Sequence, residues 1–591
     1  MSATGAAIMY RKMRAVRDEA VWATHTDRSV DLSTPVASTG SSPVSAILWL
    51  PLSIGLFAFA LRLYGLGDKP FWLDEVTSLH RATASLPELV ASSLHADHHP
   101  TYFLLLWLVA KLGTSQWLLR LPSAVFGALG AVLTYAIGRE VIGRRGGAAA
   151  GLLMALSPFE VQFAQEARSY TLVSFLILTA LWGLVRLANN PPAAAAPIWS
   201  KDAPRAAWLA YGLGTAAALD VLNVAIPWLV AANLSTAVIG HSLGNAQRSF
   251  WRNWTWVQCG VLTAWLPLLI AIYMARHGAV IDNVGWAWPF SKQTIWSIVG
   301  PVYLLRVSNF IVPGTAPATL PVLSTAIIVL VTAGAWRLSR NRVVLSVLSA
   351  ATLVLPLSLG LVSLFVPVLV PRYFVWGAAP FFMLVGAGLG QFTQLRYAAL
   401  RAALAVACFI NLAPYYRYET KPRWDLVAKK LAAQARPGDV VLFNSYYAYW
   451  VFSTFAEEAR LDEKRIDLTW KFNEAATLTP GHTLWVVYGR TGSAIAETAE
   501  EFQASLIRIL GGLPSPAEPV GRFITLWRYP DVAASASATR KIGSANRSSL
   551  GIVGNDRSCP IADLAGGVRE PGELGGEPSF ADLSSGRRDG T

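Results

Sequence analysis

Residues 61–75 read Leu61-Arg62-Leu63-Tyr64-Gly65-Leu66-Gly67-Asp68-Lys69-Pro70-Phe71-Trp72-Leu73-Asp74-Glu75, at the end of the first long apolar stretch of the chain. That stretch runs roughly from Val44 to Leu63 and is long enough to cross a membrane. Two adjacent carboxylates, Asp74 and Glu75, therefore lie at a membrane surface, behind an aromatic pair. A carboxylate beside a low-dielectric region is costly unless it serves a function. We therefore expect the chemistry of this protein at Asp74 and Glu75.

The composition is that of a polytopic membrane protein. Of 591 residues, 53% are hydrophobic and 14% are charged, with a mean hydropathy of +0.41, whereas a soluble chain carries about 25% charged residues. The net charge is +13, but Lys and Arg fall in short loops between apolar runs. This pattern indicates orientation in a membrane and argues against a nucleic-acid partner. The three cysteines suggest no disulfide framework, and no cleavable signal peptide is apparent.

Eleven apolar runs, most of them of roughly twenty residues, are predicted to span the membrane. They lie near residues 44–64, 117–142, 146–162, 170–189, 206–219, 221–240, 255–276, 317–337, 343–368, 373–393 and 398–414. Basic residues cluster in alternate loops, beginning with Arg11, Lys12 and Arg14. The positive-inside rule then places the N-terminus in the cytoplasm and the Asp74 loop outside. The loops near 163–169, 277–316 and 369–372, and everything after about 415, fall on that outer side.

The first outer loop is expected to hold two amphipathic helices that lie flat on the membrane. Residues 75–92 repeat apolar side chains at helical spacing, with charged side chains elsewhere around the helix. Residues 101–112 are apolar, but the run is too short to span. A crossing there would also move Arg144 and Arg145 to the outer side.

After Tyr415 the composition changes to that of a small α/β domain. Helices are predicted near 424–435, 446–456 and 495–510, and strands near 439–443, 466–470, 483–488 and 521–528. The predicted organisation is a cytoplasmic leader (1–43), a membrane domain (44–415), an extracytoplasmic α/β domain (416–530) and a disordered tail (531–591). The fold class is thus an α-helical polytopic membrane protein with a small C-terminal α/β domain.

Several segments, in this order, resemble the GT-C membrane glycosyltransferases. They are GLGDKPFWLDE, HADHHPTYFLLLWL and LRLPSAVFGALGAVLTYAIGREVIGRRGGAAAGLLMALSPFEVQFAQEARSYTL. The chain is most similar to the group of the protein O-mannosyltransferases, the aminoarabinose transferases and the Rgt-like enzymes, which is glycosyltransferase family 39 and its kin. The similarity is strong over about residues 45–190 and weaker at Pro371-Arg372-Tyr373 and Lys421-Pro422-Arg423-Trp424-Asp425.

The resemblance implies a GT-C fold and transfer of a sugar outside the membrane from a polyprenyl-phosphate donor. It also implies a catalytic carboxylate in the first outer loop, matched here by Asp74 and Glu75. Such a reaction needs a base for the acceptor hydroxyl and cations for the departing phosphate. We assign the base to Asp74, with Glu75 beside it. Donor phosphate or substrate binding is assigned to Lys69, His99, Glu166, Arg168, Arg372 and Tyr373.

Ordinary alternatives to these assignments stay open. Adjacent Asp and Glu in a loop are usually only solvated, and Arg168 and Arg372 at helix ends commonly reach lipid headgroups. His95, Asp97, His98 and His99 have side chains that suit zinc; no metal ligand is assigned, and a divalent metal is left open as a cofactor.

The predicted function is an integral membrane glycosyltransferase, a hexosyl or pentosyl transferase of inverting type in a bacterial cell membrane. Its predicted partners are the polyprenyl-phosphate sugar, membrane lipids and a lipid, glycan or protein acceptor. One alternative is a transporter or flippase of lipid-linked glycans, but no internal repeat and no mid-membrane charges between broken helices are seen. Another is a scaffold that merely anchors the α/β domain, for which eleven spans are excessive.

Overall fold

The computed structural model describes residues 43–95, 98–244, 247–275, 290–307, 320–470, 482–489, 498–510 and 515–529. The chain divides into two compact units, Met1–Trp49 and Leu50–Thr591. Of the first unit only the beginning of one helix is described, so the account below concerns the second. The predicted leader, up to residue 42, and the predicted disordered tail lie outside the described residues.

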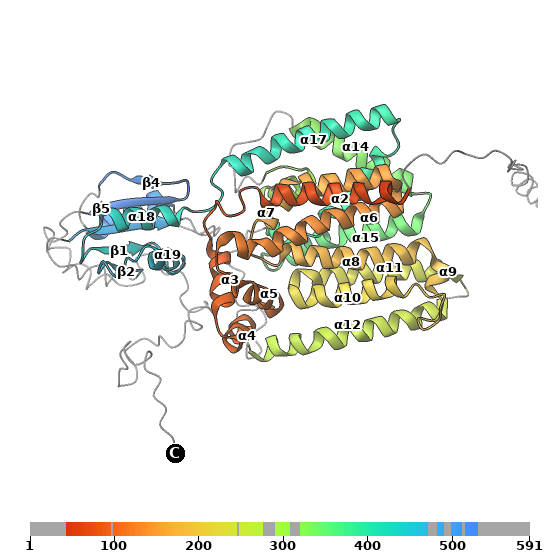
Figure 1. Ribbon diagram of the computed structural model, residues 1–591, viewed down its shortest axis with the longest axis horizontal. Coiled ribbons are helices and arrows are strands. Elements are labelled where there is room, and N and C mark those ends of the chain that lie inside the picture. Colours follow the sequence, from red (N-terminus) through yellow and green to blue (C-terminus); the bar gives the residue numbers. More distant parts are fainter. Residues whose placement is uncertain are drawn as a thin grey trace, which may run out of the picture. The chain divides into compact units, whose positions relative to one another are not determined.

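All the predicted apolar runs form helices, which Figure 1 shows largely side by side. They are α2 (Pro43–Leu63), α6 (Gln116–Leu156), α7 (Pro158–Ala164), α8 (Tyr170–Asn189), α10 (Arg205–Val221), α11 (Ile226–His241), α12 (Gln247–Ala275), α14 (Leu320–Leu338), α15 (Arg342–Val362), α16 (Ala378–Leu389) and α17 (Gln394–Arg417). Within the described residues, seven helices are long and apolar enough to cross a membrane. The number of eleven spans stays a prediction, because several of the predicted runs form helices that are shorter than a membrane-spanning helix.

A glycine separates two of the predicted spans within α6. The helix runs from Gln116 to Leu156, but Gly143 has φ of 80° and is not helical. Left-handed backbone of this kind favours glycine. The runs near 117–142 and 146–162 are therefore two helices joined at Gly143. The second ends at Leu156, where Ser157 caps α7 by accepting a hydrogen bond from the Glu160 amide.

Glycines also let neighbouring helices approach closely. A methyl group at Gly388 of α16 would overlap the carbonyl oxygen of Leu330 in α14, and one at Gly334 would overlap that of Leu384. In the same way, a methyl group at Gly147 would lie 2.8 Å from the Tyr135 carbonyl oxygen. Small residues at helix contacts are typical of membrane bundles, where close packing replaces the hydrophobic effect.

Three short helices lie across one end of the bundle (Figure 1): α3 (Leu73–Thr83), α4 (Leu86–His95) and α5 (Pro100–Ala110). The single helix expected at 75–92 is therefore wrong, because the chain breaks at Ala84 and Ser85. The Ser85 amide donates to the Glu88 carboxylate over 3.0 Å, which starts a new helix. The apolar run at 101–112 forms α5, which buries Tyr102, Phe103 and Leu106 and has eleven residues.

The C-terminal part is a five-stranded sheet with the order β2-β1-β3-β5-β4. Strand β1 (Val440–Phe443) pairs parallel with β2 (Asp467–Thr469) and β3 (Leu484–Gly489), and β5 (Ile524–Tyr529) runs antiparallel to β3. The helices of this part are α18 (Trp424–Gln434), α19 (Tyr446–Glu458) and α21 (Ala499–Leu510). Each predicted element is found. Strand β4 (Glu518–Val520), a short edge strand that contains Pro519, was not predicted.

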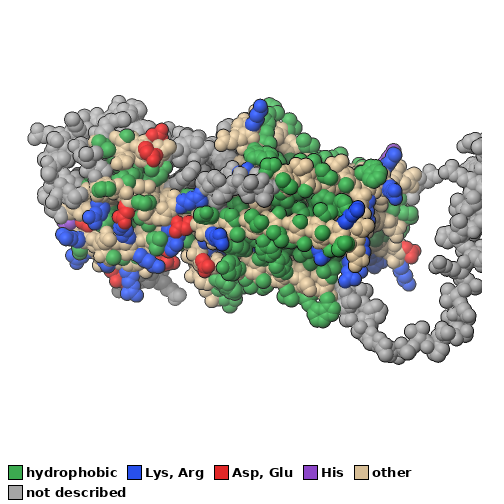
Figure 2. Space-filling view, turned by 90° about the horizontal axis from the view of Figure 1, so that it is seen from above, with side chains coloured by type: hydrophobic (Ala, Val, Ile, Leu, Met, Phe, Trp, Pro, Cys, Tyr) green, Lys and Arg blue, Asp and Glu red, His purple; other side chains and the backbone are tan. Residues whose placement is uncertain are grey.

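The surface of the helical part is largely apolar. Figure 2 shows hydrophobic side chains over most of it in this view, with Lys and Arg gathered at its end. Large exposed hydrophobic residues come from many helices and include Leu56, Leu213, Leu262, Ile328 and Leu357. A soluble protein rarely exposes so broad an apolar surface. The chain is a multi-pass membrane protein.

The close packing of α14 and α16 gives a first prediction. Gly388→Ala should destabilise the protein by about 1–3 kcal/mol, because the added methyl group must push the two helix backbones apart. Thermal unfolding of the purified protein in detergent measures this effect. Gly360→Ala in α15 is the matched control, since a methyl group there meets nothing within 4 Å. Equal unfolding temperatures for both variants would contradict the close contact.

Candidate active site

The first turn of α3 directs Asp74 and Glu75 to different surroundings. The helix begins after the extended residue Trp72, whose carbonyl oxygen accepts from the amides of Glu75 and Val76, each over 2.9 Å. Consecutive residues of a helix point about 100° apart. The Glu75 side chain is fully buried, whereas that of Asp74 keeps 18% of its surface exposed. The two adjacent carboxylates therefore have different surroundings, one inside the protein and one at its surface.

Glu75 is the most completely bonded carboxylate of the region. Its Oε1 accepts from Arg120 Nε (2.7 Å) and from the amide of Ala167 (2.9 Å). Its Oε2 accepts from Arg120 Nη2 (2.8 Å) and from Lys421 Nζ (2.7 Å). Burial alone would raise the pKa of Glu75, but Arg120 and Lys421 outweigh it and lower the pKa to about 2. Glu75 is thus a buried anion that joins three distant segments.

Arg120 uses all five of its N–H groups. Besides the two bonds to Glu75, Nη1 donates to the carbonyl oxygens of Leu66 and Lys69, each over 2.8 Å, and Nη2 donates to that of Pro70 over 3.2 Å. The planar guanidinium suits such a fixed, many-bonded role. Arg120 thereby folds the loop 66–70 around itself and brings α3 to the start of α6. No role was assigned to Arg120 from the sequence. The signal that could have identified Arg120 is its position, because it is a charged residue at the predicted outer end of an apolar span.

Two arginines lie at Asp74. Arg372 Nη1 donates to Asp74 Oδ2 over 2.9 Å, and Arg168 Nη1 donates to the Asp74 carbonyl oxygen over 3.4 Å. Burial alone would lower the pKa of Arg372, but the Asp74 carboxylate outweighs it and raises that pKa above its ordinary value. Asp74, Arg168 and Arg372 come from three separate segments of the chain, and the structure brings them together.

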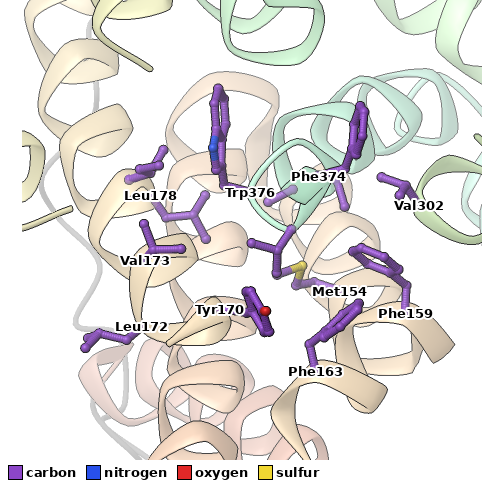
Figure 3. Close-up of a cluster of buried hydrophobic side chains, with 14 of the residues drawn as sticks. Met154, Phe159, Phe163, Tyr170, Leu172, Val173, Leu178, Val302, Phe374 and Trp376 are labelled. Carbon is purple, nitrogen blue, oxygen red and sulfur yellow. The ribbon is translucent and has the colours of Figure 1, made fainter. Parts of the chain in front are cut away.

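A cluster of buried hydrophobic side chains holds the segments that carry Arg168 and Arg372 in place (Figure 3). Phe163 of α7 packs edge-on against Tyr170, two residues after Arg168, with ring centroids 5.2 Å apart. Phe374 and Trp376, just after Arg372, are buried members of the same cluster. Both arginines thus extend from backbone that is anchored in the hydrophobic core.

Glu166 and Lys69 belong to the same charged cluster. Glu166 is 3% exposed, and among the described residues its Oε2 has no hydrogen-bond partner. Burial raises the pKa of Glu166, opposed by the positive charge of Lys421. Lys69 Nζ donates to the Tyr415 carbonyl oxygen over 2.8 Å. The same nitrogen lies 3.6 Å from the centre of the Tyr415 aromatic ring. Burial, helped by the nearby charges of Lys421 and Arg120, lowers the pKa of Lys69 to about 7.

His99 and Tyr373 take different positions. His99 precedes α5, and its Nε2 lies 2.7 Å from Asn223 Oδ1 in the short helix η1 (Asn223–Ala225). In the part of the chain that the structure describes, no hydrogen bond joins His99 to Asp74. Tyr373 lies in the short helix η3 (Pro371–Phe374), with the Arg372 guanidinium 6.0 Å from its ring centre. Tyr373 is therefore next to the group formed by Asp74, Arg168 and Arg372.

The suggested metal cluster includes Asp97, which lies outside the described residues. Elsewhere in the described ranges, no three His, Cys, Asp or Glu side chains come together as metal ligands. Lys421, like Arg120, bonds to Glu75 but had no role assigned from the sequence. It stands in one of the motifs that carried the family resemblance, but it lies far from Glu75 in sequence.

Comparison with known proteins identifies related sequences and folds. Residues 97–271 match the sequence model of the dolichyl-phosphate-mannose-protein mannosyltransferase family. The apo structure of ArnT from Cupriavidus metallidurans aligns with a TM-score of 0.50 and 13% identity, over 82% of this chain and 98% of that one. No curated protein matches this chain.

Two further structures align less well. ArnT of Cupriavidus metallidurans bound to undecaprenyl phosphate aligns with a TM-score of 0.47 and 12% identity, over 82% of this chain and 98% of that one. The oligosaccharyltransferase of Archaeoglobus fulgidus, in complex with zinc and sulfate, aligns with a TM-score of 0.43 and 13% identity, over 80% of this chain and 72% of that one.

The matched segment covers α5 to α12, and the ArnT fold extends over most of the chain, so the two findings agree. The resemblance drawn from the sequence is confirmed. The chain has an ArnT-like fold of the GT-C type, and over residues 97–271 it is similar to the dolichyl-phosphate-mannose-protein mannosyltransferase family.

Proposed function

We propose that this glycosyltransferase moves a sugar from a polyprenyl-phosphate donor to an acceptor hydroxyl, with Asp74 as the general base. The observation that carries the proposal is the pairing of Asp74. Its carboxylate is partly exposed and lies 2.9 Å from the Arg372 guanidinium, whereas Glu75 next to it is buried and fully bonded. The proposed base thus lies in hydrogen-bond contact with a cation that is suited to bind phosphate.

The donor class follows from charge and from the family match. Arg168 and Arg372 are cations beside Asp74, and guanidinium groups bind phosphate with two parallel hydrogen bonds. The matched family takes its name from a dolichyl-phosphate mannose, which is a sugar on a polyprenyl phosphate. We therefore propose a mannose-like hexose or a pentose as the transferred group, and a lipid, glycan or protein as the acceptor.

The proposed reaction is a single displacement at the anomeric carbon. The acceptor hydroxyl oxygen forms the new glycosidic bond while the bond from that carbon to the phosphate oxygen breaks. Asp74 takes the hydroxyl proton, and the electron pair of the broken bond leaves with the polyprenyl phosphate. Arg372 would turn from Asp74 to the donor phosphate, which neutralises the leaving group and frees the base. One displacement inverts the anomeric configuration.

The remaining assigned residues have supporting roles in this proposal. Glu75 orients α3 through its buried bonds rather than touching substrate. Glu166, whose pKa is raised, can carry a proton at neutral pH and donate a hydrogen bond to a sugar hydroxyl. Lys69, His99 and Tyr373 stay candidates for substrate contact.

We propose a cell-membrane location with the N-terminus in the cytoplasm and the Asp74 site on the outer face. Support comes from the basic residues at the far end of the bundle, where α14 and α15 meet at Arg337, Arg340 and Arg342. The α/β domain would then share the outer face with Asp74. Its contacts with α3, including the His80 and Trp450 rings 4.9 Å apart, favour this placement.

Asp74→Asn should lower transfer by about 10²–10⁴-fold, because the change keeps the shape and removes the proton acceptor. The measurement is release of free polyprenyl phosphate from a labelled donor panel of mannose, glucose, galacturonate and arabinose by purified protein. Asp68→Asn, at an exposed carboxylate of the same loop, is the control and should be active. Near-normal turnover of Asp74→Asn would move the base elsewhere. Wild-type protein that releases no lipid phosphate would favour a transporter.

Arg168→Ala should weaken donor use by roughly tenfold to a hundredfold, since a charge-assisted hydrogen bond is worth about 1.5–3 kcal/mol. Arg168→Lys should recover part of the loss, because lysine keeps the positive charge. The recovery should be incomplete, because lysine cannot form the two parallel hydrogen bonds of a guanidinium group. Initial rates against donor concentration test both variants. Arg186→Ala, at the exposed end of α8, is the matched control. A donor response unchanged in Arg168→Ala would show that this arginine does not bind donor.

Single cysteines in a cysteine-free background test the orientation. Ala91→Cys in α4 and Asp462→Cys in the α/β domain, both exposed, should react with an impermeant thiol reagent in intact cells or spheroplasts. Ser339→Cys, exposed at the Arg337 end, should react only after lysis. Labelling of Ala91→Cys without Asp462→Cys in intact cells would mean that the number of spans between them is odd.

A further inference from the structure

Lys421 connects the C-terminal segment to the buried carboxylate Glu75. It lies between the end of α17 at Arg417 and the start of α18 at Trp424, so it belongs to the link between the bundle and the α/β domain. Its Nζ donates to Glu75 Oε2 over 2.7 Å and approaches the Gln165 carbonyl oxygen at 3.5 Å. The side chain keeps 7% of its surface exposed, and 346 positions separate the two partners.

The link is fastened to the α/β domain on both sides of Lys421. Before it, the Glu419 carboxylate accepts from the Arg522 amide over 3.0 Å. After it, Arg423 forms a two-bonded pair with Asp425 of α18, at 2.8 Å and 2.7 Å. The position of Lys421 is therefore set by the α/β domain as well as by Glu75.

The charge of Lys421 meets a specific requirement. Two buried carboxylates, Glu75 and Glu166, lie in this region, and Arg120 has no N–H left for a further bond. A buried anion without sufficient positive charge is strongly destabilising. Lys421 supplies the second positive charge and the fourth hydrogen bond to Glu75. An apolar residue at position 421 would leave Glu75 Oε2 with one donor in place of two.

Fixing Glu75 fixes two further parts of the site. Asp74 precedes it in the first turn of α3, so the direction of the Asp74 side chain follows the rotation of that turn. Glu75 Oε1 also holds the Ala167 amide, between Glu166 and Arg168. A change at Lys421 therefore reaches Asp74 through Glu75, without direct contact.

We propose that Lys421 is a positioning residue of the active site, which acts through Glu75 to orient Asp74 and makes the C-terminal segment a working part of that site. This inference rests on the proposed function, in which Asp74 is the reacting base. It assigns Lys421 no contact with the donor phosphate, because its ammonium group is engaged by Glu75 and Gln165.

The kinetic test compares Lys421→Met with Lys429→Met in the full-length protein. Lys429 is exposed on α18 and is the matched control. Lys421→Met should lower kcat about tenfold to a hundredfold and leave KM for the donor within about twofold, because a misdirected base slows the chemical step. Lys429→Met should keep both values. A higher donor KM at unchanged kcat would show that Lys421 binds phosphate, and normal kinetics would show no role; either result overturns the inference.

Two further variants test the route through Glu75. Lys421→Met should cost little more in a Glu75→Gln background, because residues that act as a unit are not additive. Independent, additive losses would overturn the inference. Lys421→Cys in a cysteine-free background, alkylated with 2-bromoethylamine, restores an ammonium group at nearly the original length and should recover kcat. Failure of this rescue, with alkylation confirmed by mass, would point to a merely structural role.

A measurement without substrate separates this inference from the proposed function. Amide hydrogen exchange in the first turn of α3, at Glu75 and Val76, should quicken at least tenfold in Lys421→Met and stay unchanged in Lys429→Met. Faster exchange together with an active Asp74→Asn variant would refute Asp74 as the base and keep Lys421 as the residue that holds α3. Unchanged exchange would overturn the inference about Lys421, whatever the transferase assay shows.

Discussion

The ion pair between Glu75 and Arg120 is the constraint on which the candidate site depends. Both side chains are almost completely buried, and every N–H of Arg120 and both oxygens of Glu75 are hydrogen-bonded. A pair of this kind adds little net stability over an apolar contact, because desolvation offsets the attraction. Breaking it is costly, since one partner would remain as an unpaired buried charge. The pair therefore specifies one arrangement of the loop 66–70, α3 and α6, and an alternative arrangement must separate the charges.

That arrangement gives two neighbouring carboxylates opposite properties. Glu75 faces inward to Arg120 and Lys421, and its low pKa follows from those two cations. Asp74, one residue earlier, faces Arg372 and keeps part of its surface open. Because the Glu75 side chain is directed into the protein, that of Asp74 is directed to a partly exposed position beside Arg372. The proposed base and a buried structural carboxylate can be neighbours in sequence because consecutive residues of a helix point in different directions.

The glycine contacts between α14 and α16 and within α6 serve a related purpose. Membrane helices have no hydrophobic effect to press them together, so close backbone approach and interior packing determine their positions. The aromatic cluster around Phe163, Tyr170 and Phe374 then fixes the loops that carry Arg168 and Arg372. The bundle can thus present rigid loops at its α3 end, where the proposed chemistry needs groups held at fixed distances.

The sequence by itself determined the membrane class, the positions of the apolar helices and the elements of the α/β domain except β4, and it predicted a functional role for Asp74 and Glu75. These features are local: they follow from runs of apolar residues, from helical or alternating spacing, and from a motif with a strong family resemblance. The break of the expected helix at 75–92 was missed, because the capping pattern from Ser85 to Glu88, which starts a new helix, was not recognised in the sequence. The tertiary structure alone decided that Glu75 is buried, that Arg372 is the partner of Asp74, and that His99 lies with Asn223 instead. It also brought Arg120 and Lys421 to Glu75 across 45 and 346 positions of sequence. No local pattern encodes such pairings, because a charged side chain acquires its role from what the folded chain places against it.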